Sequence, residues 1–128
     1  MRSSELKMFF NKLISSSQMK NLIIHEVENY KISLRTKGKS VPIYLIEDEE
    51  IIITNVDVSL ILNAYIDESF TDFDLYYIID AMLLSSKMIF DNECIVDLIE
   101  TFTDPEINGM FTKDKAKEVL MQFTLAPS

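Results

Sequence analysis

The chain has 128 residues, of which 48% are hydrophobic and 26% charged, and its formal net charge is -9. This composition excludes disordered and fibrous chains, and the single Cys and single His exclude an internal disulfide and a Cys/His zinc site. No apolar run approaches the roughly 18 residues of a membrane span and no signal peptide is recognisable, so we expect one soluble cytoplasmic domain, residues 1–128, with no membrane contact.

The N-terminal region predicts helix. Ser3 or Ser4 can cap a first helix. Its apolar residues recur at helical spacing: Leu6, Phe9, Phe10, Leu13 and Ile14. After the serines at 15–17, residues 20–28 fit a second helical piece, but Leu22–Ile24 also fits a strand. The pattern leaves helix and strand open for residues 20–28.

The next segment predicts a small sheet. Tyr30, Ile32 and Leu34 alternate with polar residues, which is typical of a half-buried strand. Two further apolar runs, 41–46 and 51–54, are rich in β-branched residues and are set off by turn-forming sequences. We therefore expect a three-stranded antiparallel meander over about residues 30–54.

The C-terminal half predicts helices, because every apolar stretch from residue 57 onward follows the 3.6-residue period. Candidate caps are Asn55 or Asp57, then Thr71 with Asp74 as a capping box, then Asp91, with Asp104–Pro105 ending the third helix. The expected fold class is α+β. In it, the meander of about residues 30–54 packs with an N-terminal helix and a mostly helical C-terminal half.

Acidic residues are concentrated in the middle of the chain. Residues 43–110 hold sixteen Asp and Glu against the single Lys87. Such a charge repels nucleic acid and attracts a basic protein, although an acidic surface can also serve only to keep a domain soluble. The residues that we expect to contact a partner form a first acidic cluster, Glu47, Asp48, Glu49 and Glu50, and a second acidic cluster, Asp67, Glu68, Asp72 and Asp74.

Residues 104–115 imitate a calcium-binding loop but lack its main ligand. Carboxylates and an amide alternate through Asp104, Glu106 and Asn108, and Gly109 occupies the sixth position. The twelfth position should be a bidentate Glu, and here it is Lys115. A cation in that place disfavours calcium, so we expect a helix–helix connection with Thr112 capping the last helix.

No residue pattern indicates catalysis. His25 lies beside two isoleucines, and Cys94 lies between Glu93 and Ile95, where an acidic neighbour disfavours the thiolate. Paired carboxylates occur, but the chain has no Trp to form a sugar-binding platform and too few Gly for a phosphate-binding loop. We therefore expect no enzyme, no cofactor and no metal.

One stretch carries a family resemblance. Asp74–Ser85, followed by Asp104–Gly109 and Thr112–Lys115, is similar to the helical half of immunity proteins from bacterial contact-dependent growth inhibition systems. The resemblance spans about residues 57–123. It implies a non-enzymatic cytoplasmic protein that binds and neutralises a cognate toxin domain, commonly a nuclease, whose cationic active site an acidic protein can occlude.

Other functions are compatible with the same charge pattern. The chain could be an acidic regulatory or adaptor domain that binds an endogenous basic protein, or a protein that mimics nucleic acid. An enzyme that uses acidic residues is the least favoured reading. A toxin gene directly upstream would separate the immunity protein from the other two.

Overall fold

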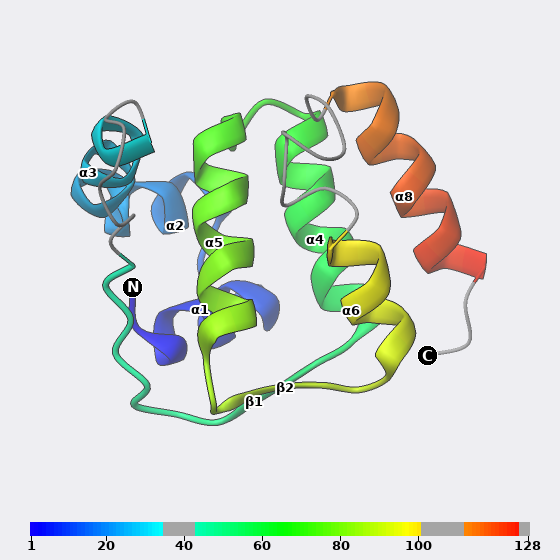
Figure 1. Ribbon diagram of the computed structural model, residues 1–128, viewed down its shortest axis with the longest axis horizontal. Helices are drawn as coiled ribbons and strands as arrows, with labels where there is room; N and C mark the ends of the chain where they lie inside the picture. Colours follow the sequence, from blue (N-terminus) through cyan, green and yellow to red (C-terminus); the bar gives the residue numbers. More distant parts are fainter. Residues whose placement is uncertain (35–42, 101–111, 126–128) are drawn as a thin grey trace.

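The computed structural model describes residues 1–34, 43–100 and 112–125 (Figure 1). Within these ranges the chain forms seven helices and two short strands. They are α1 (Ser3–Phe10), α2 (Ser16–Leu22), α3 (Ile24–Leu34), β1 (Ile51–Ile53), α4 (Asn55–Ile66), α5 (Asp72–Leu84), β2 (Met88–Phe90), α6 (Glu93–Glu100) and α8 (Lys113–Leu125).

The α+β class with an antiparallel meander over about residues 30–54 was the wrong expectation: the described chain is mostly helical. Residues 30–34 are the last turns of α3, and residues 20–28 lie in α2 and α3. The buried positions of this region, Ile23, Val27 and Tyr30, have helical spacing, whereas Ile32 is exposed. The alternation of Tyr30, Ile32 and Leu34 was therefore the last part of a helical pattern. It is too short to distinguish the two-residue period of a strand from the 3.6-residue period of a helix. Residues 35–42, where a turn was expected, lie outside the described residues.

The observed sheet has two parallel strands. Ile51, Ile52 and Ile53 of β1 pair with Met88, Ile89 and Phe90 of β2. A parallel pair needs a long crossover connection, which α4 and α5 provide. The strand expected at 51–54 is thus confirmed in position. Its partner, β2, lies in the C-terminal half, which was expected to be helical. Residues 43–50 run as extended chain, with one isolated bridge between Arg2 and Ile46.

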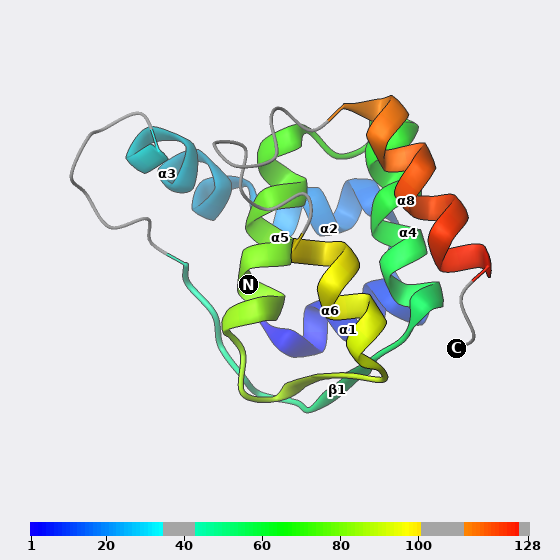
Figure 2. The ribbon, with the colours of Figure 1, turned by 45° about the vertical axis from the view of Figure 1, so that its right-hand side comes forward.

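Two largely apolar helices form the centre of the molecule. α4 and α5 stand side by side, with α3 beside α5 and α8 beside α4 (Figure 1). Turned by 45°, the molecule shows α6 in front of this pair and α2 behind it (Figure 2). The largest fully buried side chains come mainly from the central pair, including Ile61, Leu62, Tyr77, Ile78 and Met82. Burial on several sides explains why α4 and α5 are apolar nearly all round.

The helix caps were predicted in part. Thr71 and Asp74 form the expected capping box of α5: the Thr71 amide donates to Asp74 at 2.8 Å and the Asp74 amide to Thr71 Oγ1 at 3.2 Å. Thr54, not Asn55 or Asp57, is the cap of α4, and Asn92, not Asp91, accepts from the first turn of α6. Thr112 accepts from the Lys115 amide at the start of α8, as expected. None of the described helices is long and apolar enough to cross a membrane.

Candidate functional site

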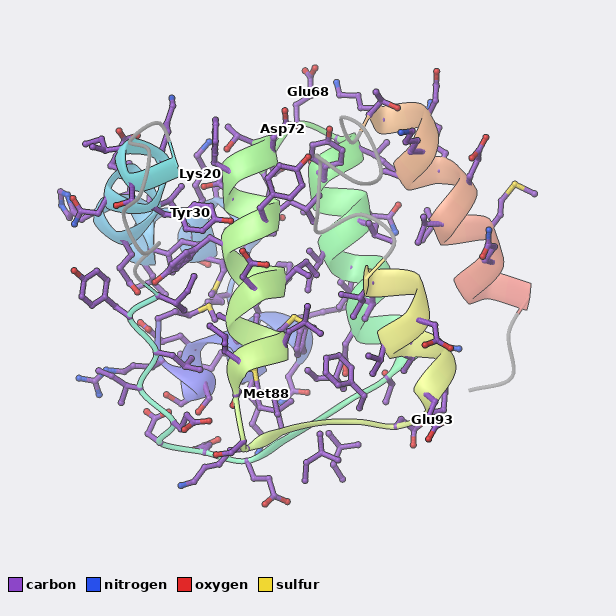
Figure 3. The ribbon with its side chains drawn as sticks, in the orientation of Figure 1. Lys20, Tyr30, Glu68, Asp72, Met88 and Glu93 are labelled. Atoms are coloured by element: carbon purple, nitrogen blue, oxygen red, sulfur yellow. The ribbon has the colours of Figure 1, made fainter. Side chains whose placement is uncertain are left out.

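The two acidic clusters lie at opposite ends of the molecule. Glu47 contacts the residues that follow α5, whereas Asp72 and Asp74 belong to the first turn of α5. This helix has 13 residues, a length of about 20 Å. In Figure 3, Glu68 and Asp72 appear at the end of the helices away from β1 and β2, and Met88 marks the strand end. The eight carboxylates therefore do not form one contact face.

Glu47 is an anchor between two segments of the chain. Its carboxylate accepts hydrogen bonds from the Ser85 hydroxyl and from the backbone amides of Ser86 and Lys87, at 2.7 Å and 3.3 Å for the amides. The Lys87 ammonium donates in turn to the Glu47 carbonyl at 3.1 Å. These hydrogen bonds lower the pKa of Glu47. Glu47 thus fixes the end of α5 against the extended segment that leads into β1.

Asp48 caps α1 from a distant part of the sequence. Its carboxylate accepts from the Ser4 amide at 2.9 Å, the Ser4 hydroxyl at 2.6 Å and the Ser3 hydroxyl at 2.9 Å. Ser3 and Ser4 were expected to cap this helix themselves, but Arg2 holds the cap position. Asp48 supplies the negative charge that a helix N-terminus favours.

The Asp48 contacts predict how stability depends on pH. Hydrogen bonds from Ser4 lower the pKa of Asp48 to about 2, from an ordinary value of 3.8. Because the folded-state pKa is the lower one, ionised Asp48 stabilises the fold above about pH 3.8, and this stabilisation is lost as the pH falls toward 2. We expect Asp48→Asn to lower the Tm at pH 7. We also expect its Tm to change less than the wild-type Tm between pH 5 and pH 2, in thermal unfolding followed by circular dichroism.

The control for this measurement is Glu50→Gln, since Glu50 is exposed in the same cluster. Its Tm should follow the wild-type pH profile. If Asp48→Asn and the wild type gave parallel profiles, the assignment of Asp48 as an ionised cap would be wrong.

The remaining members of the first cluster face solvent. Glu49 lies 3.4 Å from the Lys7 ammonium in an exposed ion pair, a kind of contact that contributes little to stability. Glu50 is exposed and lines a pocket of about 270 Å³ between α1 and β1. Of the first cluster, Glu49 and Glu50 are therefore the residues placed to meet a partner.

The second cluster is also divided between structural and exposed roles. Asp74 is only 3% exposed, and its carboxylate lies 3.5 Å from the Lys20 ammonium of α2. Asp72 is hydrogen-bonded to Tyr65, and burial together with this bond raises the pKa of the tyrosine. Asp67 accepts from the Ser69 amide, and Glu68 forms an ion pair with Lys113 of α8. Asp67 and Glu68 remain exposed, whereas Asp74 is not available to a partner.

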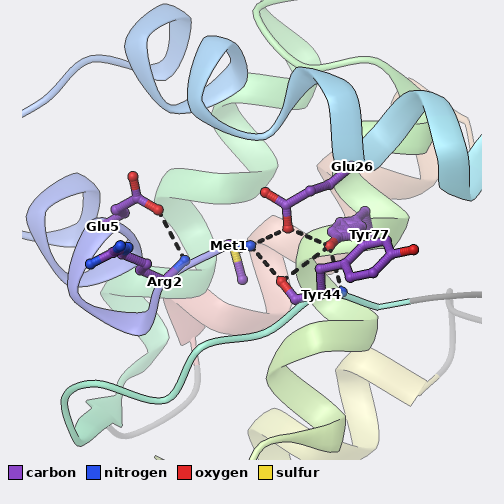
Figure 4. A network of polar contacts seen from close by, with 6 residues as sticks. All are labelled: Met1, Arg2, Glu5, Glu26, Tyr44 and Tyr77. Carbon is purple, nitrogen blue, oxygen red and sulfur yellow. Dashed lines mark hydrogen bonds and ion pairs between the residues drawn. The ribbon is translucent and has the colours of Figure 1, made fainter.

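A partly buried polar network, which sequence reasoning missed, joins four segments: the N-terminus, α3, the segment before β1, and α5 (Figure 4). The Tyr77 hydroxyl of α5 donates to Glu26 of α3 at 2.7 Å and accepts from the Tyr44 amide at 3.0 Å. The Met1 nitrogen also donates to Glu26 and to the Tyr44 carbonyl. Nearby in α3, the Tyr30 hydroxyl donates to Asp80 at 2.7 Å. The apolar periodicity of these helices gives no signal of such bonds, because the partners are 25 or more residues apart in sequence.

The second feature that sequence reasoning missed is an apolar face on the sheet. Ile52 and Ile89 are paired across the two strands and are 61% and 47% exposed. Glu50 directly precedes β1 and Asp91 directly follows β2, and both are exposed. Because the strands are parallel, these two acids lie at opposite ends of the ribbon, with the isoleucine pair between them. We call Ile52 and Ile89 the strand face.

The other residues considered for chemistry are described only in part. His25 is exposed in the first turn of α3, not in the apolar setting that its neighbours suggested. Residues 101–111 of the calcium-like loop and the Cys94 side chain lie outside the described part of the chain, and Lys115 belongs to α8. In the described ranges, no group of three His, Cys, Asp or Glu residues could hold a metal ion.

Comparisons with protein-family models, with curated proteins and with solved structures find no match to this chain.

Proposed function

We propose that this chain is an immunity protein that binds a cognate bacterial toxin domain, a basic nuclease, and neutralises it in the cytoplasm by covering its cationic active site. The observation that carries the proposal is the charge around the sheet. Segments 47–57 and 86–97 hold eight acidic residues and a single basic one. The resemblance of residues 57–123 to immunity proteins supports the same function.

The charge distribution suits rapid capture of a basic protein. Complementary surface charges raise association rates strongly at low salt, which benefits an inhibitor that must intercept a toxin before it acts. Glu47 and Asp48 each accept several hydrogen bonds within the chain and Glu49 pairs with Lys7, whereas Glu50 and Asp91 are exposed at the sheet end. A nuclease cleft, lined with Lys and Arg to hold phosphate, is the complementary surface.

The test uses the C-terminal domain of the polypeptide encoded directly upstream of this gene. We expect expression of that domain to stop growth, and co-expression of this chain to restore it. The purified proteins should form a complex whose association rate falls as salt is raised. If the upstream domain is toxic but neither binds this chain nor is relieved by it, the proposed function is wrong.

A charge reversal tests whether the acidic residues at the sheet raise the association rate with the toxin domain. Glu50→Lys with Asp91→Lys should slow association by about tenfold at low salt and weaken its salt dependence, since rim charges act mainly on the association rate. The matched control is Glu28→Lys with Glu118→Lys, which reverses two exposed charges on α3 and α8. Stopped-flow mixing over a salt series measures both. Equal rates for the two double variants would place the contact away from the sheet.

A further inference from the structure

The strand face combines two exposed apolar side chains that the sheet register pairs with each other. Side chains alternate along a strand, so the burial of Ile51, Ile53 and Met88 directs Ile52 and Ile89 outward. The register sets these two directly opposite each other, where cross-strand neighbours touch. Single exposed apolar residues are common on protein surfaces, but here two large β-branched side chains form one continuous patch.

Acidic groups and a pocket border this patch. Glu50 and Asp91 flank it at the two ends of the ribbon. Beside Ile52 lies the pocket of about 270 Å³ between α1 and β1, and its charged lining residues are Glu50, Asp57 and Lys7. An apolar centre with a charged rim is the usual anatomy of a protein–protein contact.

We propose that the strand face is the centre of the contact with the basic partner, an inference that rests on the proposed function. An apolar side chain of the partner packs on Ile52 and Ile89, and Lys or Arg residues around it pair with the exposed carboxylates of Glu50 and Asp91 at the two ends of the ribbon. The negative charge of Glu50 and Asp91 favours a basic partner over a second copy of this chain. Two copies facing each other here would bring like charges together, which is unfavourable.

The test separates the apolar centre from the acidic rim. Ile52→Thr with Ile89→Thr keeps the β-branched shape that strands favour and removes apolar contact area. We expect the Kd for the upstream-encoded toxin domain to rise by about 30-fold or more, through faster dissociation, because residues at the centre of a contact dominate its affinity. The association rate should stay near the wild-type value, in contrast to the Glu50/Asp91 reversal. Surface plasmon resonance measures both rates.

Leu13→Ala with Met121→Ala is the matched control, because both are exposed apolar residues away from the sheet, Leu13 in the connection between α1 and α2 and Met121 on α8. Ile89→Ala alone is a second variant, and a Tm measurement verifies that each variant is folded. If the wild type binds and the folded threonine or Ile89→Ala variants bind within twofold of it, the strand face is not the contact, and the proposed function stands.

Two further outcomes would also overturn the inference. If the wild type does not bind the upstream domain, the proposed function fails and the inference fails with it. If sedimentation shows that the chain alone forms a dimer that the threonine substitutions dissociate, a second copy covers the strand face.

Discussion

Replacing Phe70 with alanine should lower the free energy of unfolding by about 3–5 kcal/mol, the range for removing a buried aromatic ring. Phe70 is only 2% exposed, although it lies in the connection between α4 and α5. Its amide donates to the Ala64 carbonyl at 3.0 Å, and its ring centroid lies 5.6 Å from that of Phe9 in α1. The ring therefore packs the α4–α5 connection, which contains Asp67 and Glu68, against α1.

A loss of this size is a large part of the stability of a typical domain, about 5–15 kcal/mol. Urea denaturation followed by circular dichroism measures it. Phe70→Leu is the control, since it keeps an apolar side chain in the site and should cost less. A double-mutant cycle with Phe9→Leu should show a coupling of about 0.5–1.5 kcal/mol, typical of aromatic pairs. A loss below about 1 kcal/mol for Phe70→Ala would show that the ring is not packed as described.

The helices of the C-terminal half could be predicted because their signals are local. Thr71 and Asp74 are three residues apart, and the side chain of each accepts from the backbone amide of the other. The mainly apolar segment of α5 runs for 13 residues, a length typical of a helix and not of a strand. In the N-terminal half the decisive contacts are distant instead. Tyr30 is buried by helix packing, and its hydroxyl bonds to Asp80, fifty residues further along the chain.

The strand β2 could not be predicted, because three residues with no period of their own become a strand only through pairing with β1. The same limit applies to the candidate site. Ile51, Ile52 and Ile53 are chemically identical, and only the pairing decides that Ile52 faces outward. Within the first acidic cluster, Asp48 has a structural role that Glu50 lacks, because the first turn of α1 lies beside Asp48 and donates hydrogen bonds to it. Sequence could locate the acidic segment but could not divide its carboxylates into structural and exposed ones.

Replacing Tyr77 with phenylalanine should lower the free energy of unfolding by about 1–3 kcal/mol, the cost of leaving buried polar groups without a partner. The ring would still fill its place, but the Tyr44 amide would lose its acceptor and Glu26 one of its donors. Burial raises the pKa of Tyr77 above its ordinary value, so the hydroxyl keeps its proton and remains a donor.

Tyr44→Phe is the matched control, because the Tyr44 side chain is 55% exposed and only its backbone takes part in these bonds. Its stability should stay within about 0.5 kcal/mol of the wild type, as for most surface substitutions. Hydrogen exchange provides a local measurement: the Tyr44 amide should exchange faster in Tyr77→Phe and at the wild-type rate in the control. Since the segment from Tyr44 to Glu50 leads directly into β1, faster exchange there would show that the polar network around Tyr77 holds the sheet end of the molecule in place. Unchanged exchange and stability in Tyr77→Phe would contradict that role.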